Sequence, residues 1–303
     1  MITDAHSVST RHDGDPAREV PFGGNSLQHG TAVFEGIRCY DGAGGPSLFR
    51  LDDHLRRLRR SADLIGIAEP PPLAELRERV LAAVPDHLPD CYLRPVLYAP
   101  DPILGLDLRR LRFRLGIEVW PAAPVARHAG LSLTISPWRR PPAECLPAGA
   151  KATGAYVMSA VARTAAARAG FDDAVQLDLH TGRVVEASVS NVFLVSRGVL
   201  RTPWLTDGPL AGITRDTVLA LATDLGIDAR EGPVTTSELH EADEIFLTGT
   251  AIELMPVRAL EGRRLDPSGP IFRALLARFD DAVSGLLQAP DGWLTRAPIP
   301  ATR

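Results

Sequence analysis

Residues 146–156 read Leu-Pro-Ala-Gly-Ala-Lys-Ala-Thr-Gly-Ala-Tyr and contain Lys151, the single lysine in a chain of 303 residues. The other 32 of the 33 residues counted as Lys plus Arg are arginines, so arginine supplies the generic positive charge everywhere else. Arginine stays protonated at any accessible pH, whereas lysine can lose its proton and act as a nucleophilic amine. Lys151 is therefore either a chance survivor on the surface or a position where an amine is required.

Small residues surround Lys151, because Ala150, Ala152 and Gly154 lie in what we expect to be a loop between a strand and a helix. Small neighbours let a flat ring approach the backbone closely, and a lysine amine can form a Schiff base with a carbonyl cofactor such as pyridoxal phosphate. Such a cofactor needs three further groups: a phosphate cradle, a carboxylate near the pyridine nitrogen, and a donor to the phenolic oxygen of the ring.

The sequence offers a candidate for each of these groups. Residues 210–216, Leu-Ala-Gly-Ile-Thr-Arg-Asp, open a strongly periodic helix, whose first N–H groups are a natural phosphate site. Thr214 could instead simply cap this helix. Glu186 could hold the pyridine nitrogen protonated, or it could be an outward-facing charge on a strand. Tyr156 could reach the phenolic oxygen, or it could be a buried tyrosine of a helix.

The composition argues against several classes of protein. A net charge of −4 gives no basic footprint for nucleic acid, and no run of 18 apolar residues predicts a membrane span. The polar N-terminus lacks a hydrophobic signal segment, which points to the cytoplasm. Cys39, Cys91 and Cys145 have no CxxC spacing and the histidines are scattered, so we expect neither a disulfide framework nor a metal site.

The apolar pattern predicts an α+β protein in two domains. Helices are predicted over residues 52–66, 73–84, 155–169, 213–225 and 270–287, and strands over residues 112–119, 131–136, 173–179, 183–188, 191–196 and 244–248. A linker at residues 121–130 separates an N-terminal domain, residues 1–120, from a C-terminal domain, residues 131–303, which carries Lys151. We expect residues 1–25 to be a loose lead-in with at most a weak strand, and the Pro-rich tail after Ala289 to be loosely held.

Seven signatures at consistent spacing carry a family resemblance. They are His29-Gly-Thr-Ala-Val-Phe34-Glu35-Gly36-Ile-Arg38-Cys-Tyr40, Phe49-Arg50…His54-Leu-Arg-Arg57, Tyr92-Leu-Arg94-Pro, Ala150-Lys151-Ala-Thr-Gly-Ala-Tyr156, Glu186…Asn191-Val-Phe, Leu210-Ala-Gly-Ile-Thr-Arg-Asp216 and Gly249-Thr250-Ala251-Ile-Glu-Leu-Met-Pro256. From residue 29 to residue 265 the chain resembles the branched-chain amino acid aminotransferases of fold-type IV, or class IV, among pyridoxal phosphate enzymes. The resemblance implies the two-domain D-amino acid aminotransferase-like fold with the cofactor at the domain interface, a homodimer, and ping-pong transamination between an L-amino acid and a 2-oxo acid.

The resemblance also implies a role for each matching position. Lys151 would be the catalytic Schiff-base lysine and the base that moves the α-proton. The cofactor contacts would be Arg57, Tyr156, Glu186, Leu210, Gly212, Ile213, Thr214, Gly249 and Thr250. The substrate pocket would contain His29, Phe34, Gly36, Arg38, Tyr92, Arg94, Thr250 and Ala251. Arg94 suits the distal carboxylate of glutamate because its planar fork binds carboxylates bidentately, although it could also be a structural ion pair at a strand end.

Several departures concern the substrate shell. His29 replaces a tyrosine usual in the family, and Val189 replaces a glycine expected three residues after Glu186. Residues 101–110, a segment that in the family reaches the neighbouring subunit's pocket, lack the usual glycine-rich spacing, and the interdomain loop at 122–130 is short and has no tyrosine. Leucine, isoleucine and valine are therefore in doubt as substrates. The alternatives are a specialised amino acid or amine, an aminodeoxychorismate lyase-type or D-amino acid transaminase activity, and a member without turnover.

Overall fold

The computed structural model describes residues 9–12, 22–122, 125–287 and 290–298. The chain divides into two compact units. The first comprises Met1–Ala123, Ala150–Gly154 and Asp281–Arg303, and the second comprises Pro124–Gly149 and Ala155–Asp280. The first unit therefore includes two segments that the sequence-based division places in the second domain, and one of them contains Lys151.

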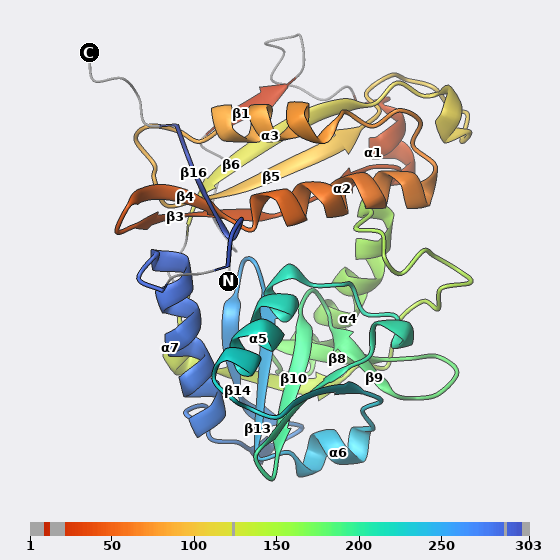
Figure 1. The fold of residues 1–303 in the computed structure, drawn as a ribbon. Coiled ribbons are helices and arrows are strands. Elements are labelled where there is room, and N and C mark those ends of the chain that lie inside the picture. The colour runs from red at the N-terminus through yellow and green to blue at the C-terminus, as the bar shows by residue number, and fades with distance from the viewer. Residues whose placement is uncertain (1–8, 13–21, 123–124, 288–289, 299–303) are drawn as a thin grey trace. The chain divides into compact units, whose positions relative to one another are not determined.

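The first unit is built on a seven-stranded antiparallel sheet (Figure 1). Its strands are β1 (Ser9–His12), β2 (Val33–Phe34), β3 (Ile37–Gly42), β4 (Gly45–Phe49), β5 (Cys91–Tyr98), β6 (Arg114–Pro121) and β16 (Leu294–Arg296). They pair in the order β1-β6-β5-β3-β4-β16, and β2 pairs with β5. The sequence pattern predicted β6 and allowed a weak strand near β1. It missed β2 to β5, because β2 and β4 are short and Pro95 interrupts the pattern of β5.

Side-chain alternation gives this sheet one apolar face. Ile37, Leu93 and Val119 are neighbours in register across β3, β5 and β6, and all three are fully buried. They pack in one core cluster with side chains of α2 (Leu51–Ile65) and α3 (Leu73–Ala82). The helices α2 and α3 therefore cover this face, and the opposite face of the same strands is left to carry other side chains.

That opposite face carries a row of polar and aromatic side chains. Arg38 on β3 is opposite Tyr92 on β5, and Tyr92 is opposite Trp120 on β6. Because directly opposed residues share a face, these three side chains lie on the same side of the sheet. The apolar core thus fixes the register that brings these three side chains together.

The second unit contains a nine-stranded mixed sheet. Its strands are β7 (Leu131–Ile135), β8 (Asp173–Leu177), β9 (Val184–Ala187), β10 (Asn191–Ser196), β11 (Val199–Pro203), β12 (Ala229–Gly232), β13 (Glu244–Gly249), β14 (Glu253–Leu260) and β15 (Arg263–Arg264). They pair in the order β12-β11-β10-β13-β14-β7-β8-β9, with β15 on β14. All five strands that the sequence predicts in this half are present within two residues of their expected ends, as β7, β8, β9, β10 and β13.

Four helices belong wholly or mainly to the second unit: α4 (Tyr156–Arg168), α5 (Ile213–Asp224), α6 (Thr236–Glu241) and α7 (Pro270–Ser284). The rings of Phe193 on β10 and Phe246 on β13 stack with centroids 5.1 Å apart. Phe272 of α7 packs on Phe246 at 5.5 Å, which fixes this helix against the sheet. The predicted helices correspond to α2, α3, α4, α5 and α7. The α+β fold class expected from the sequence is confirmed.

The tail after Ala289 differs from the expectation over residues 290–298, which are firmly held. Arg50 N donates to Trp293 O at 2.7 Å, and the Trp293 ring packs edge-on against Phe49 with centroids 5.7 Å apart. Ala297 N donates to Pro46 O at 2.9 Å, and Ala297 belongs to the core cluster of the first unit. The proline content misled the expectation, because the prolines flank β16 rather than interrupt its pairing with β4. Residues 299–303 lie outside the described part.

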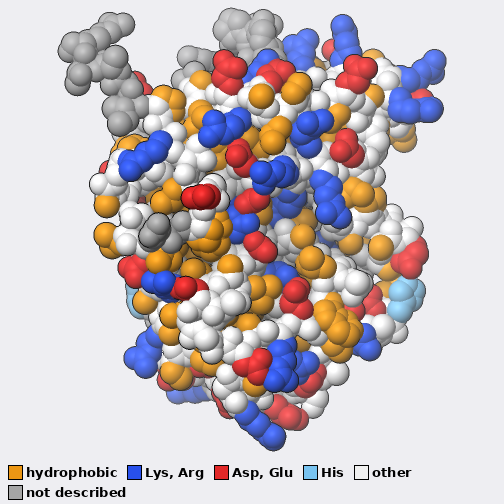
Figure 2. All heavy atoms as spheres, viewed as in Figure 1, with side chains coloured by type: hydrophobic (Ala, Val, Ile, Leu, Met, Phe, Trp, Pro, Cys, Tyr) orange, Lys and Arg blue, Asp and Glu red, His pale blue; other side chains and the backbone are white. Residues whose placement is uncertain are grey.

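Charges of both signs are interspersed on the face of the described residues shown in Figure 2, in each of the two units. This mixture agrees with the net charge of −4 for the whole chain. Among the residues that the structure describes, no helix is long and apolar enough to cross a membrane.

Candidate active site

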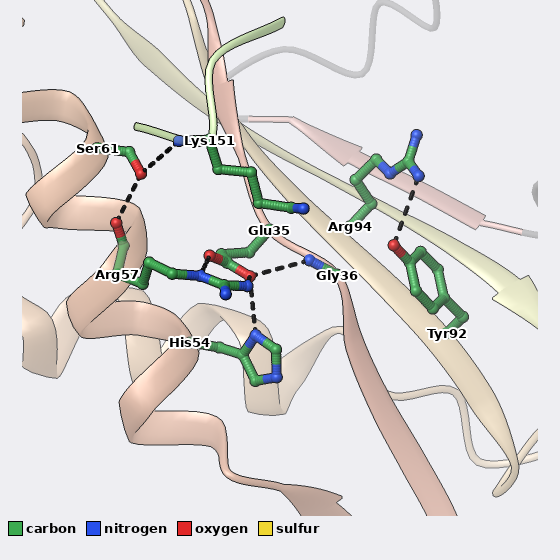
Figure 3. Close-up of polar contacts among 8 residues, drawn as sticks. All are labelled: Glu35, Gly36, His54, Arg57, Ser61, Tyr92, Arg94 and Lys151. Atoms are coloured by element: carbon green, nitrogen blue, oxygen red, sulfur yellow. Dashed lines mark hydrogen bonds and ion pairs between the residues drawn. The ribbon is translucent and has the colours of Figure 1, made fainter. Parts of the chain in front are cut away.

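Lys151 is held in the first unit by its backbone on two sides. Phe34 N donates to Lys151 O at 3.1 Å, and Lys151 N donates to Ser61 Oγ at 3.0 Å (Figure 3). The same Ser61 hydroxyl donates to Arg57 O at 2.8 Å. Lys151 Nζ lies 5.0 Å from the centroid of the Phe34 ring. The lysine loop is therefore fixed between β2 and α2, with its amine beside an aromatic wall.

The residues after Lys151 continue this attachment. Thr153 N donates to Ala32 O at 2.8 Å, and Thr153 Oγ1 donates to Gly30 O at 2.9 Å. Gly30 has a φ of +68°, and a Cβ built on it would lie 3.0 Å from the Gly154 Cα. Two glycines are therefore needed where the two chain segments touch. His29, predicted in the substrate pocket, is an exposed residue at the end of α1 (Asn25–His29).

Glu35 is a fully buried carboxylate below the Lys151 side chain in the view of Figure 3. Its Oε1 accepts from Arg57 Nε at 2.6 Å, and its Oε2 accepts from Arg57 Nη2 at 2.8 Å. The Oε2 atom also meets His54 Nδ1 at 2.8 Å and accepts from Gly36 N at 3.2 Å. The sequence analysis quoted Glu35 within a signature but assigned it no role. Its burial is visible only in the fold.

The protonation states of this cluster follow from burial and charge. Burial alone would raise the pKa of Glu35, but the charge of Arg57 and the hydrogen bonds from Arg57 and His54 outweigh it, so that pKa lies well below its ordinary value. Burial lowers the pKa of His54, the hydrogen bond and charge of Glu35 raise it, and the positive charges of Arg57 and Lys151 lower it, so that the pKa lies below its ordinary value. His54 is therefore neutral at pH 7. Because the carboxylate only accepts, Nδ1 carries the proton.

An arginine enclosed by aromatic rings lies on the polar face of the same sheet. The guanidinium carbon of Arg94 is 5.1 Å from the Phe34 ring centroid, 5.6 Å from that of Tyr92 and 5.4 Å from that of Trp120. Arg94 Nη2 donates to the Tyr92 hydroxyl at 3.4 Å. The sequence analysis missed Trp120, although its alternation along β6 places it on this face opposite Tyr92.

Two further residues predicted in the substrate pocket lie next to the aromatic rings around Arg94. A Cβ built on Gly36 would lie 2.0 Å from the Tyr92 hydroxyl, so only glycine lets this tyrosine take its place. Arg38 is buried, with its guanidinium carbon 4.8 Å from the Tyr40 ring centroid, and Nη2 pairs with Asp90 at 3.1 Å. The structure thus brings Phe34, Gly36, Arg38, Arg57, Tyr92, Arg94 and Lys151 together in the first unit.

In the second unit, Glu186 is the centre of a buried polar network. Its Oε2 accepts from Asn191 Nδ2 at 3.1 Å and from Leu210 N at 3.2 Å, and its Oε1 pairs with Arg140 Nη2 at 2.9 Å. Glu186 is therefore buried, and the alternative of an outward-facing strand charge is wrong. The role of Arg140 was not predicted from the sequence, because Arg140 lies far from Glu186 along the chain. An isolated backbone bridge between Arg140 and Asp178 holds this segment near Glu186.

The start of α5 lies against this network. A Cβ built on Gly212 would lie 1.9 Å from Asn191 Oδ1, so glycine is required where the amide packs. Gly212 is the N-cap residue, and no side chain caps the helix. The backbone N–H groups of Ile213 and Thr214, in the first turn, therefore make no hydrogen bond within the helix and point out of its N-terminus. The alternative that Thr214 caps the helix is therefore wrong.

Other predicted cofactor residues of the second unit lie at element ends. Tyr156 is the first residue of α4, and Gly249 is the last of β13. Thr250 and Ala251 form the turn to β14. These residues belong to the same unit as Glu186, Leu210, Gly212, Ile213 and Thr214.

The described residues fit pyridoxal phosphate. Each unit, taken by itself, contains groups of the right chemistry: an amine with an aromatic wall in the first, and a buried carboxylate with an uncapped helix start in the second. In addition, neither polar atom of the fully buried Gln176 side chain has a hydrogen-bond partner among the described residues, and Gln176 is opposite Glu186 across β8 and β9. An unsatisfied buried amide is costly, which is typical of a site built for a polar ligand.

Comparisons with known proteins identify the family of the chain. The model of the family "Amino-transferase class IV" matches residues 32–260. The chain is 34% identical to the branched-chain-amino-acid aminotransferase of Salmonella typhimurium over 281 residues, which cover 89% of this chain and 90% of that protein. It is 37% identical to a putative branched-chain-amino-acid aminotransferase of Methanocaldococcus jannaschii, covering 85% of this chain and 88% of that protein.

Solved structures give the same result. A branched-chain aminotransferase from Thermoproteus uzoniensis with norvaline superposes with a TM-score of 0.90 at 38% identity, covering 96% of this chain and 99% of that chain. The branched-chain amino acid aminotransferase from Thermobaculum terrenum, in its holo form with pyridoxal phosphate, superposes with a TM-score of 0.81 at 34% identity, covering 87% and 88%.

The fold is that of a class IV aminotransferase, and the chain belongs to that family. Within it, the chain is similar to branched-chain amino acid aminotransferases, as the signatures predict. Pyridoxal phosphate as cofactor and transamination as reaction are confirmed with the family, and the lyase and D-amino acid alternatives are not favoured.

The neutral state of His54 predicts a specific pH dependence of stability. The pKa of His54 is lower in the folded chain than the value of about 6.5 in the unfolded chain, so the unfolded state binds the extra proton as pH falls. The contribution of His54 is complete above about pH 6.5 and decreases below it by up to about 1.4 kcal/mol per pH unit. His54→Asn keeps a donor near the Nδ1 position but cannot titrate, so its unfolding free energy should fall less steeply.

Urea unfolding of both proteins between pH 5 and pH 7.5 measures this difference. His87→Asn, at an exposed position, is the control and should keep the wild-type slope. Identical slopes for wild type and His54→Asn would mean that the pKa of His54 is the same in the folded and unfolded protein, which would contradict this prediction.

Proposed function

We propose that this aminotransferase moves the amino group of an L-amino acid, branched-chain-like or specialised, to a 2-oxo acid in a ping-pong cycle, with pyridoxal phosphate attached to Lys151. The observation that carries the proposal is the placement of Lys151. The single lysine of the chain is pinned by its backbone between β2 and α2, and its amine lies against the Phe34 ring. When bound, the cofactor supplies a carbonyl that condenses with amines and a ring that withdraws electrons.

The residues around the cofactor would then have separate tasks. The Lys151 amine carries the proton that leaves the substrate α-carbon. Arg57 and the first turn of α5, at Ile213 and Thr214, hold the phosphate, because a guanidinium and free N–H groups both bind phosphate oxygens. Leu210, Gly212, Gly249 and Thr250 shape the backbone near the phosphate and ring, and Tyr156 donates to the phenolic oxygen.

Glu186 would face the pyridine nitrogen. Arg140, Asn191 and the Leu210 N–H all donate to its carboxylate, and such donors favour the ionised form. An ionised carboxylate beside the ring nitrogen keeps that nitrogen protonated. This supports the assignment of Glu186 as the group that makes the ring an electron acceptor.

The substrate side would lie on the polar face of the first unit's sheet. Phe34, Tyr92 and Trp120 offer aromatic surface for an aliphatic side chain, and Arg38 and Arg94 offer positive charge for carboxylates. In this proposal Gly36 and the Thr250–Ala251 turn would leave room for the substrate backbone, and the exposed His29 would lie at the rim. Another solved branched-chain amino acid aminotransferase, 33% identical to this chain, is known in complex with 4-methylvaleric acid, which is consistent with an aliphatic substrate here.

The single lysine allows a direct test of the attachment. Borohydride reduction of the protein with pyridoxal phosphate should fix the cofactor to one peptide, the one that contains Lys151, since no other side chain of the chain is a primary amine. Lys151→Arg should fold as wild type and lose transamination by at least about 10³-fold, because a guanidinium neither forms the imine nor releases a proton. Mass spectrometry of the peptides and a coupled assay provide the two measurements. Reduced cofactor on another peptide, or wild-type turnover of Lys151→Arg, would refute the proposal.

If Arg94 binds a substrate carboxylate, its loss should change kcat/KM more for dicarboxylic than for aliphatic substrates. Arg94→Gln should lower kcat/KM for glutamate or 2-oxoglutarate by about 10- to 100-fold, the value of a charge-assisted hydrogen bond, and leave an aliphatic donor much less affected. Arg112→Gln, which removes an exposed arginine of the same unit, is the matched control. Equal losses for both substrate types would assign Arg94 a structural role instead.

We also propose that the chain is a homodimer through the loop at residues 101–107. The buried Asn25 amide donates to Ile103 O at 2.6 Å and to Gly105 O at 2.9 Å, so this loop is held in place. Even so, it exposes 83% of Leu104 and 63% of Leu106, beside an exposed Ile103. A fixed, exposed apolar loop is typical of an interaction surface.

The double variant Leu104→Asp and Leu106→Asp should be a monomer in sedimentation at micromolar concentration, where wild type should be a dimer. Leu286→Asp, at another strongly exposed leucine, should remain a dimer. A monomeric wild type, or an unchanged double variant, would contradict the proposal.

A further inference from the structure

Glu35 has no place among the groups proposed so far to touch cofactor or substrate. It is nonetheless fully buried, on the connection between β2 and β3, and it accepts from two side chains and one backbone N–H. A buried carboxylate is costly to desolvate, and a buried ion pair is often no better for stability than apolar residues of the same volume. Stability alone therefore does not explain the ion pair of Glu35 with Arg57.

The contacts of Glu35 fix the orientation of Arg57. The two carboxylate oxygens of Glu35 accept hydrogen bonds from Nε and Nη2 of the Arg57 guanidinium, at 2.6 and 2.8 Å. Because the guanidinium is planar, this two-point contact sets the direction of the whole group. A phosphate would then meet the other edge, formed by Nη1 and Nη2. Figure 3 shows the pair beneath the Lys151 side chain, next to the helix that carries Arg57 and Ser61.

His54 and Gly36 in turn fix Glu35. Oε2 accepts from Arg57 Nη2 and Gly36 N and from the protonated Nδ1 of a neutral His54, so the carboxylate cannot rotate without losing several donors. A neutral His54 adds no positive charge of its own that would compete with Arg57 for the carboxylate.

The same helix also couples Arg57 to the lysine loop. Ser61 Oγ accepts from Lys151 N at 3.0 Å and donates to Arg57 O at 2.8 Å, one turn away on α2. A shift of the Arg57 backbone would therefore be transmitted through Ser61 to the backbone of Lys151.

We propose that Glu35, held by His54, is a positioning residue that orients Arg57 for the phosphate monoester of the cofactor. The inference rests on the proposed function, because it takes Arg57 as a phosphate ligand. A purely structural alternative is that Glu35 only ties α2 to the sheet. The two alternatives differ in one observable: orientation of Arg57 affects the phosphate group alone, whereas loosening of α2 affects every part of a bound ligand.

The test compares pyridoxal phosphate with 5-deoxypyridoxal, which has the same ring and carbonyl but lacks the phosphate. Dissociation constants for both are measured by absorbance titration of the full chain. The dissociation constant of 5-deoxypyridoxal divided by that of pyridoxal phosphate is the ratio that reports the phosphate contribution, without any assay of activity. Glu35→Gln should reduce this ratio by about tenfold or more, the value of a charge-assisted contact. Arg57→Gln should reduce it similarly, and the double variant should show little further loss, because both changes remove one interaction.

Asp53→Asn is the matched control, since Asp53 forms ion pairs with Arg50 and Arg56 in the first half of the same α2. It should keep the wild-type ratio. A ratio that stays unchanged in Glu35→Gln while both ligands weaken equally would overturn the inference in favour of the structural alternative. A wild type that binds neither ligand would instead refute the proposed function.

His54 provides a second test in case Glu35→Gln does not fold. His54→Leu removes a donor to Oε2 and should lower the ratio by about threefold or more, whereas His54→Asn, which keeps a donor, should leave it near wild type. Equal ratios in these two variants would also overturn the inference.

Discussion

The attachment of the Lys151 loop to the first unit is the constraint on which the rest of the site depends. Two backbone hydrogen bonds, from Phe34 N and to Ser61 Oγ, hold the lysine between a strand and a helix that lie far from it in sequence. Around it lie a buried carboxylate, a buried neutral histidine and the arginine that pairs with the carboxylate, and such groups are stable only when all partners are in place. The loop thus gains a fixed position, while the amine itself stays beside an aromatic ring.

In the second unit, a buried carboxylate is likewise held by several donors, but these come from different residues. There the carboxylate of Glu186 has an arginine, an amide and a backbone N–H as donors, and glycine at 212 lets the amide of Asn191 approach the start of α5. In both units, then, a buried acid is surrounded by donors. Such arrangements hold geometry tightly, because any movement leaves a buried charge without a partner. This is what an enzyme needs if a cofactor ring and phosphate are to be kept in one orientation.

Much of the fold and of the chemistry could be predicted from the sequence. The helices α2, α4 and α5 follow from three- and four-residue spacing, and strands such as β7 and β10 from their apolar pattern. The prediction for the tail was wrong over residues 290–298, because its prolines concealed Trp293 and Ala297, which contact residues 46–50 where β16 pairs with β4. The strands β2 to β5 were missed for the same kind of reason: their pattern is short or broken locally, and pairing within the sheet and cover by α2 and α3 stabilise them.

The identity of the reactive groups was determined by the sequence itself. A lone lysine among arginines, followed by a tyrosine and framed by signatures in a fixed order, defines the amine chemistry, because no other residue of the chain can supply it. Which groups support that amine was decided only by the tertiary structure. Glu35, His54, Trp120 and Arg140 are ordinary residues in the sequence. They become parts of the site because burial removes water, and a carboxylate without water must take its hydrogen bonds from whichever donors the fold brings within reach.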